Sequence, residues 1–223
     1  MRARLLILLV LVSPALLSTS LFAQVAEINP YAGFYWPGNT SMFYSFQNNQ
    51  LLGVRGGYYF TPAIEVGANY SWSNHFQPKN SAPPSAFAGQ LGFPQGKVRA
   101  NIWEGEFTYN FGKRTLFGAE LKPYLVGGVG GLTTSTKSPS TFVLTVRPVL
   151  LSSGDVVFVP KDVLGSSDTF FTFSYGGGLK AERLWHSVGV FGDARGRTVP
   201  NFFSSAFNWP EVSAGLILSW GER

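Results

Sequence analysis

The sequence predicts an all-β protein, an eight-stranded antiparallel up-and-down β-barrel that crosses a membrane. Three observations predict it. Apolar residues alternate with polar or small ones over many segments, and the connections between these segments alternate between long and short. Aromatic residues make up 16% of the chain and charged residues only 13%, against roughly 25% charged residues in ordinary soluble domains. After Ala23, no apolar run approaches the roughly 18 residues of a membrane helix.

The amino terminus reads as a secretory signal peptide, 1–23. Arg2 and Arg4 precede a short apolar run, and Ala23 suits the position before cleavage. Cleavage leaves one domain, 24–223. Its net charge is +3, because the loss of two arginines leaves 15 of 17 basic residues against 12 acidic ones. This mild, unclustered excess is not typical of a nucleic-acid partner.

Period-two alternation predicts eight strands, each close to the roughly 9 to 11 residues that a tilted transmembrane strand needs. They cover approximately 25–36, 50–61, 63–74, 98–111, 121–132, 168–180, 186–198 and 210–220. The odd-numbered connections are long and predict extracellular loops over 37–49, 75–97, 133–167 and 199–209. The even-numbered connections are short, as turns on the periplasmic side of a membrane meander are.

Among the first four strands, the third and fourth are the clear cases of one apolar face and one polar or small face. The first two carry aromatic residues near their ends, Trp36 and Tyr58. The apolar face of the third holds Ile64, Val66, Ala68, Tyr70 and Trp72. The apolar face of the fourth holds Trp103, Phe107, Tyr109 and Phe111. This strict alternation is typical of strands rather than helices.

The last four strands keep the same pattern with more glycine. The fifth contains Gly127 to Gly131, which lacks the Lys-Ser/Thr of a phosphate loop and permits close backbone approach in a sheet. The apolar face of the sixth holds Phe171, Phe173, Tyr175 and Leu179. The seventh carries its charges on one face, and the eighth reads VSAGLILSW, 212–220. In the eighth, the apolar face holds Val212, Ala214, Leu216, Leu218 and Trp220.

The parity of a residue, its odd or even place along a strand, assigns it to a face but does not tell which face points outward. A soluble barrel has its apolar face inside, whereas a membrane barrel has it outside. Amphipathic aromatic residues near the strand ends favour the membrane barrel, where they form interfacial girdles. They are Trp36, Tyr58, Tyr70, Trp72, Tyr109 and Trp220. A secreted, soluble ligand-binding barrel of the lipocalin type is the alternative.

An eight-stranded barrel is only wide enough for side chains to fill its interior. We therefore expect the polar faces to form a plug, with a narrow pore as the alternative. The predicted polar network of the lumen comprises Glu27, Arg55, Glu65, Glu104, Glu106, Lys180, Glu182, Asp193, Arg195, Arg197 and Glu211. Arg197 and Glu211 flank the last loop and are placed to pair.

No catalytic, cofactor or metal site is predicted. The chain has no cysteine, and its two histidines, His75 and His186, fall at opposite ends of the predicted barrel. His186 and Ser187 are adjacent, so their side chains would point to opposite faces of a strand. A lipid-modifying enzyme is therefore a less favoured alternative.

One stretch lies outside the eight-strand scheme. Residues 141–151 and 155–160 read as two strands joined at Ser152 to Gly154, and as membrane strands they would make the barrel ten-stranded. The second arm is short and both arms contain proline. We predict a β-hairpin outside the membrane, a candidate binding surface with Phe142, Val157 and Phe158 as possible contacts.

The last strand carries the pattern polar-x-Gly-x-x-hydrophobic-x-hydrophobic at Ser213, Gly215, Leu218 and Trp220. In this pattern and in its topology the chain resembles the small outer-membrane β-barrel proteins of Gram-negative-type bacteria, the OmpA/OmpX-like group. Members commonly end on the final aromatic residue, whereas three residues follow it here. The resemblance implies that Ser213 to Trp220 is a C-terminal assembly signal.

The same resemblance implies a place in the outer membrane, with lipid and lipopolysaccharide around the barrel and insertion by the barrel assembly machinery. It implies a structural, adhesion or surface-interaction role, with an extracellular ligand reached through the loops. Neither an enzymatic activity nor a peptidoglycan-binding domain after the barrel is expected.

Overall fold

The computed structural model describes residues 25–37, 39–41, 44–45, 47–76, 98–116, 119–136, 142–164, 167–185, 187–202 and 205–221. The predicted signal peptide, most of the predicted loop 75–97, and His186 lie outside the described residues. Within the described part, no helix is both long and apolar enough to cross a membrane.

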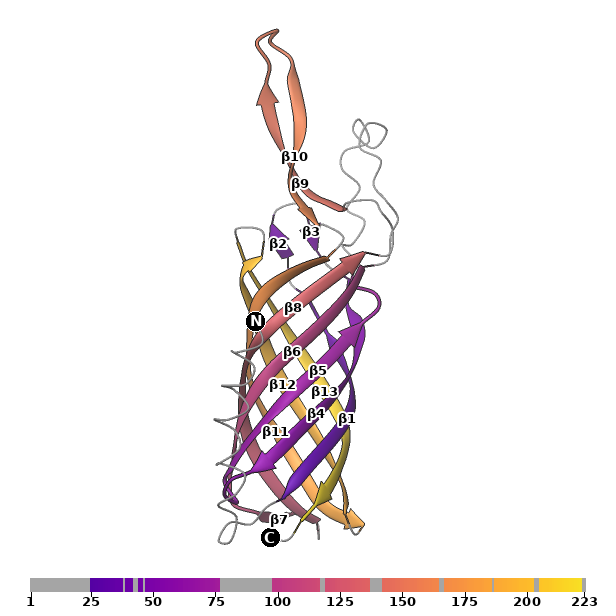
Figure 1. Ribbon diagram of the computed structural model, residues 1–223, viewed down its shortest axis with the longest axis vertical. Coiled ribbons are helices and arrows are strands. Elements are labelled where there is room, and N and C mark those ends of the chain that lie inside the picture. The colour runs from indigo at the N-terminus through magenta and orange to yellow at the C-terminus, as the bar shows by residue number, and fades with distance from the viewer. Residues whose placement is uncertain are drawn as a thin grey trace, which may run out of the picture.

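Eight long strands close into an antiparallel barrel (Figure 1). They are β1 (Ala26–Tyr35), β4 (Asn49–Tyr59), β5 (Ile64–Ser73), β6 (Val98–Asn110), β8 (Ala119–Thr136), β11 (Ser167–Trp185), β12 (Val188–Phe202) and β13 (Ser205–Trp220). Each pairs with the next in this order, and β13 pairs with β1, with Gly215 opposite Tyr31. The predicted all-β, eight-stranded up-and-down barrel is confirmed, because these are the eight predicted strands in their predicted order.

The two ends of the barrel differ. At one end, here called the turn end, β1 begins and β13 finishes, and the short β7 (Arg114–Leu116) pairs with the start of β8. Thr61 closes the turn between β4 and β5, where its Oγ1 accepts hydrogen bonds from the backbone nitrogens of Ala63 and Ile64. The other end, called the loop end, carries β2 (Asn39–Ser41) and β3 (Tyr44–Ser45), which pair with each other.

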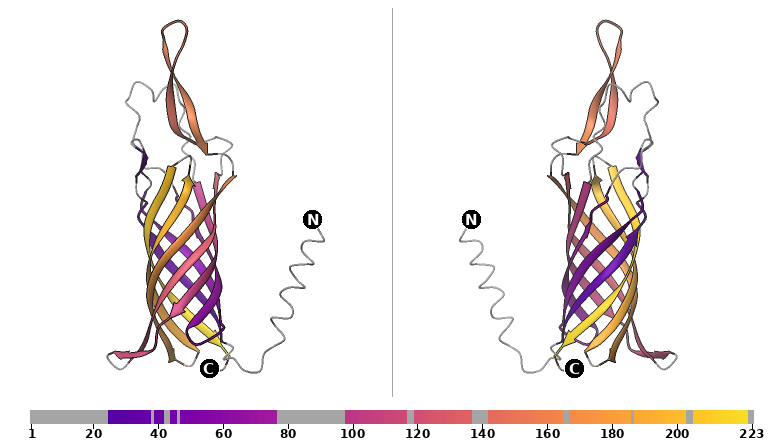
Figure 2. Two further views of the ribbon diagram at one scale, coloured as in Figure 1. Left: turned by 90° about the vertical axis from the view of Figure 1, so that its left-hand side faces the viewer. Right: turned by 90° about the vertical axis from the view of Figure 1, so that its right-hand side faces the viewer.

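At the loop end, β9 (Phe142–Leu150) and β10 (Val156–Leu164) form a hairpin that rises beyond the barrel (Figures 1 and 2). Among the residues that the structure describes, they pair only with each other, as a separate two-stranded sheet. The hairpin prediction is therefore confirmed, and the ten-stranded alternative is wrong.

Residues 199–209 differ from the predicted loop, because they are largely strand. β12 continues to Phe202, β13 begins at Ser205, and these two residues are paired in the ladder. The physical reason is burial, since Phe202, Phe207 and Trp209 point into the barrel and pack together. Their polar and proline-containing surroundings made this stretch resemble a loop in the sequence.

The barrel is apolar outside and polar over much of its inside. The residues on the predicted apolar faces are exposed, among them Val66, Tyr70, Trp103, Phe107, Phe171 and Tyr175. The charged residues of the opposite faces are buried. This is the arrangement of a transmembrane barrel and the reverse of a water-soluble one, so the lipocalin-type alternative is wrong.

Candidate functional site

The interior of the barrel is the candidate functional site, and all eleven residues of the predicted network point into it. Alternation places them there, since every second residue of a barrel strand faces inward. They sort into three clusters along the barrel axis. Each of the seven carboxylates lies within ion-pair distance of a Lys or Arg side chain.

The first cluster lies toward the turn end and is organised by Lys180. Its Nζ donates to Glu27 at 3.0 Å, to Glu65 at 2.7 Å and to the hydroxyl of Tyr59 at 3.0 Å. Three bonds satisfy the three donors of an ammonium group. One lysine therefore neutralises part of the charge of two carboxylates from different strands.

Beside this cluster lies Lys122, a buried base that the sequence prediction missed. Its Nζ is 3.3 Å from Glu182 and 4.5 Å from the centre of the Tyr59 ring. Parity could have found it, because Lys122 shares an inward face with Tyr124 and Val126 on β8. The inward alternation was not recognised at Lys122 because this residue lies at the start of the predicted strand, just before Pro123. It raises the bases in the interior from four to five.

The second cluster, at mid-depth, is a four-membered network of two arginines and two acids. Arg55 lies 3.3 Å from Glu106 and 3.2 Å from Asp193. Arg195 also pairs with both acids, with Nε 2.8 Å from Asp193 and Nη1 2.5 Å from Glu106. Because planar guanidinium groups present several fixed donors, two arginines can link both carboxylates across the lumen.

Neighbouring groups complete the coordination of this network. The hydroxyl of Tyr124 donates to Asp193 at 3.0 Å, and the hydroxyl of Ser213 donates to the same carboxylate. The guanidinium of Arg55 lies 4.9 Å from the ring centres of both Tyr31 and Phe191. Ser213, assigned to the assembly signal by resemblance, therefore also has a place in the interior network.

The third cluster lies nearer the loop end and is centred on Arg197. Its Nε and Nη2 donate to the two carboxylate oxygens of Glu211 at 3.2 and 3.0 Å. The sequence suggested that these two residues pair, and the structure adds that the pairing is bidentate. Its Nη1 forms an ion pair with Glu104, which also accepts a hydrogen bond from Ser174 at 3.3 Å. All three charged side chains are almost fully buried.

Above the third cluster the interior is apolar, which corrects the expectation of a polar interior throughout. We call this layer the apolar cap. It comprises Tyr35, Leu51, Phe76, Val98, Ala100, Ile102, Leu132, Val199, Phe202, Phe207 and Trp209. Phe207 lies at its centre, with ring centroids 4.8 Å from Trp209 and 5.1 Å from Phe202. Parity missed the layer because four of its five aromatic residues, Phe76, Phe202, Phe207 and Trp209, fall in the predicted loops.

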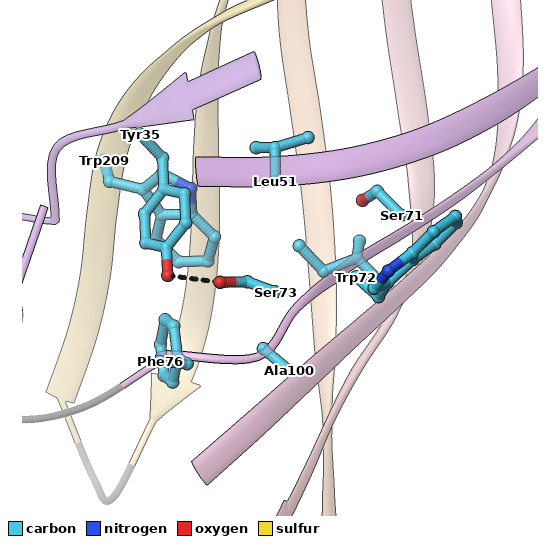
Figure 3. Close-up of a pocket in the computed structure, with 9 residues that line it drawn as sticks. Tyr35, Leu51, Ser71, Trp72, Ser73, Phe76, Ala100 and Trp209 are labelled. Carbon is cyan, nitrogen blue, oxygen red and sulfur yellow. Dashed lines mark hydrogen bonds between the residues drawn. The ribbon is translucent and has the colours of Figure 1, made fainter. Parts of the chain in front are cut away.

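A small pocket lies at one side of the apolar cap, between Tyr35, Leu51, Phe76 and Trp209 (Figure 3). Tyr35 and Ser73 share a hydrogen bond of 2.9 Å there. The pocket has a volume of about 10 Å³, roughly what one water molecule requires. It is thus a packing gap rather than a binding site for an organic ligand.

The remaining site residues lie on the last strand. Gly215 and Leu218 pair with Tyr31 and Ile28 of β1 at the closing seam of the barrel, and Trp220 is exposed at the turn end. Of the two histidines, only His75 is described, and its carbonyl oxygen accepts a hydrogen bond from Asn49. Among the residues that the structure describes, no three His, Cys, Asp or Glu side chains are grouped to hold a metal ion.

The fold and the interior together define a class: an eight-stranded transmembrane β-barrel whose described interior holds ion-paired and apolar side chains. No model of a known protein family matches the chain, and no curated protein sequence matches it. Among solved structures it is similar to Neisserial surface protein A, with 13% identity and a TM-score of 0.55, over 86% of this chain and 96% of that one. The chain thus has the fold of the small outer-membrane β-barrels.

Two further solved structures are more distantly similar. The N-terminal β-barrel domain of OprF from Pseudomonas aeruginosa has 14% identity and a TM-score of 0.46, over 87% of this chain and 97% of that one. Ail, the attachment invasion locus protein of Yersinia pestis, was solved in complex with the heparin analogue sucrose octasulfate. It has 11% identity and a TM-score of 0.42, over 90% of this chain and all of that one.

Proposed function

We propose that this protein is an integral outer-membrane barrel with a closed lumen, and that it acts through its surface rather than by catalysis or conduction. The observation that carries the proposal is the occupation of the interior by buried side chains, in three ion-pair clusters and then in the apolar cap. The loop end, with its projecting hairpin, faces the exterior, and the turn end faces the periplasm. Its role is structural, or adhesion and contact with other surfaces.

Electrostatics supports a plug over a pore. The buried arginines and carboxylates are held by partners from several strands, so an ion would have to displace bonds such as that between Arg195 and Glu106. Such charge pairs are expensive to separate in a low-dielectric interior. The apolar cap adds a second barrier, because a constriction lined with Phe207 and Trp209 disfavours water.

Bilayer recordings test the closed lumen. Purified full-length protein in a planar lipid bilayer is expected to show no large, stable single-channel current, because both polar and apolar layers block the lumen. Heat-modifiable migration on a gel first establishes that the barrel in the sample is folded. A porin reconstituted in parallel shows that the assay detects channels. Stable unitary conductance from the folded protein would contradict the proposal.

The partners in this proposal are lipid and lipopolysaccharide around the apolar belt, the barrel assembly machinery during insertion, and an extracellular ligand at the loop end. The belt supports the first, since exposed residues such as Leu125, Val129 and Phe171 need an apolar surrounding. The position of Trp220 supports the second, because it is 53% exposed and so its aromatic ring is not needed to fill the interior of the barrel.

Replacement of Trp220 by serine tests the assembly signal. Outer-membrane levels, measured by membrane fractionation and detergent extraction, are expected to fall several-fold, because the final aromatic residue of the signal is lost. The purified variant should refold in detergent much as the parent does, since Trp220 is at the surface of the barrel. Normal outer-membrane levels of the serine variant would show that Trp220 is not part of the assembly signal. Trp220→Phe is the matched control, because it keeps an aromatic ring.

A further inference from the structure

The tip of the β9–β10 hairpin is unusual for a segment outside the membrane. Within the described part of the chain, the hairpin pairs with no barrel strand, and it rises beyond the loop end (Figures 1 and 2). We define the tip as residues 149–157, which read VLLSSGDVV. Four aliphatic side chains in it are exposed: Leu150 by 71%, Leu151 by 45%, Val156 by 54% and Val157 by 41%.

These side chains surround the hairpin with aliphatic residues directly behind its polar turn, Ser152 to Asp155. Val156 and Val157 are consecutive in β10 and therefore lie on opposite faces of the hairpin, while Leu150 ends β9 and Leu151 follows it at the turn. Leu150 is paired with Val156, and Val149 with Val157, so aliphatic residues of the two arms lie opposite each other on two successive rungs of the ladder. A hairpin that packs flat on a protein surface needs only one apolar face. A tip with aliphatic residues on two faces is better matched to an apolar environment that contacts both faces at once.

The backbone of the turn is also suited to an apolar medium. The backbone nitrogen of Leu151 donates to the carbonyl of Asp155 at 2.8 Å, and that of Gly154 donates to the carbonyl of Leu151 at 2.9 Å. Gly154 has a φ of 88°, a left-handed conformation that glycine adopts without strain. Ser153 Oγ donates to the Asp155 carboxylate at 2.8 Å. Polar groups bonded within the turn lose less on leaving water.

We propose that this tip inserts into the headgroup and acyl boundary of an opposing lipid bilayer, such as the surface of another cell. The two aliphatic residues of each arm span roughly 7 Å at about 3.3 Å per residue, comparable to the roughly 5–10 Å depth of interfacial segments. The inference rests on the proposed function only in taking the loop end to face outward.

The charge of the tip favours lipid over an acidic partner, and the size of the pocket at the apolar cap favours lipid over a second copy of the chain. Asp155 is the one charged residue of the tip, so the tip lacks the basic residues that bind acidic partners and fits an uncharged, zwitterionic surface. A second copy of the chain offers a poor receptor at its apolar cap, because the pocket there measures about 10 Å³ and would not admit a leucine side chain. Lipid requires no preformed pocket.

A flotation assay tests the proposal. Full-length protein in nanodiscs is mixed with protein-free phosphatidylcholine vesicles, and the vesicles are floated on a density gradient. The protein-loaded nanodiscs are expected to float with the vesicles, and empty nanodiscs are not. Leu150→Ser with Leu151→Ser should weaken this association at least about tenfold, because two exposed apolar side chains are lost. Leu150→Met with Leu151→Met, the matched control, should stay within about twofold of the parent because it conserves apolar surface.

The outcomes decide the proposal. Association should persist in about 0.5 M salt, where charge contacts are screened. The proposal is overturned if folded parent protein does not float, if the serine variant floats equally, or if salt abolishes the association. Binding to protein-bearing cell membranes but not to protein-free vesicles would assign the tip to a protein partner and overturn it too. The assay does not depend on lumen closure, so a conducting barrel would refute the proposed function without touching this result.

Discussion

Replacement of Arg197 by methionine is expected to lower the free energy of unfolding by about 3–5 kcal/mol, the usual effect of removing one partner from a buried ion pair. Arg197 is 1% exposed and bonds both oxygens of Glu211 while pairing with Glu104. Methionine fills much of the same volume, so the loss reflects two buried carboxylates left without their base. Urea unfolding of the refolded barrel in lipid vesicles measures it.

A surface ion pair provides the control. Lys113 and Glu120 are 2.8 Å apart, but their side chains are 48% and 60% exposed, and such pairs contribute about 0–1 kcal/mol. Lys113→Met should therefore change stability little. Arg197→Met combined with Glu104→Gln and Glu211→Gln should recover part of the loss, since no unpaired charge stays buried. If Arg197→Met is no more harmful than Lys113→Met, the buried cluster does not stabilise the barrel.

Replacement of Gly215 by alanine is expected to destabilise the barrel by about 1–3 kcal/mol, as overpacking does. Gly215 lies at the β13–β1 seam, opposite Tyr31. An added Cβ would lie 2.7 Å from Tyr31 Cβ and 2.8 Å from Phe191 Cε1, and it would also press against the carbonyl oxygen of Pro30. The backbone of β1 must shift to admit it, which strains the closure. Refolding yield and urea unfolding without any assembly machinery measure the effect.

Gly192 is the matched control on the neighbouring strand. A Cβ there would meet only the carbonyl oxygen of Ser213, at 3.8 Å, so Gly192→Ala should be tolerated. Equal stability of the two alanine variants would show that the β13–β1 seam accommodates a Cβ at position 215 and would contradict the expected overpacking. The close packing also means that Gly215 variants do not isolate the assembly signal. A loss of outer-membrane level in them would follow from impaired folding alone.

The fold was largely predictable because strand alternation is a local property. On β5, Val66 and Tyr70 are exposed while Glu65 and Asn69 are buried, as counting by twos predicts. The hairpin of β9 and β10 was predictable for a similar reason, since its two arms flank a Ser-Ser-Gly turn. Prediction failed where alternation was interrupted by polar or proline residues, as in the stretch from Val199 to Trp209.

The candidate site was predictable in its members and less so in its bonds. Inward parity selected the eleven charged residues, but it did not tell that Arg195 meets Glu106 or that Lys180 meets Glu27. Lys122 and the apolar cap were missed at the strand ends, where the boundaries of a predicted strand are least certain. The pairing of Arg197 with Glu211 was foreseen because β12 and β13 are consecutive.

The sequence by itself determined the order of the eight predicted strands and the two faces of each, because these follow from a period of two residues and from loop lengths, but the structure was needed to exclude a ten-stranded barrel. Only the tertiary structure decided which face is inside, which charges pair across the lumen and where the polar interior gives way to the apolar cap. Lys180 and Glu27 are 153 positions apart in sequence. What brings such residues together is the stagger of the strands when the sheet closes on itself, a geometric property of the whole barrel that no single strand carries.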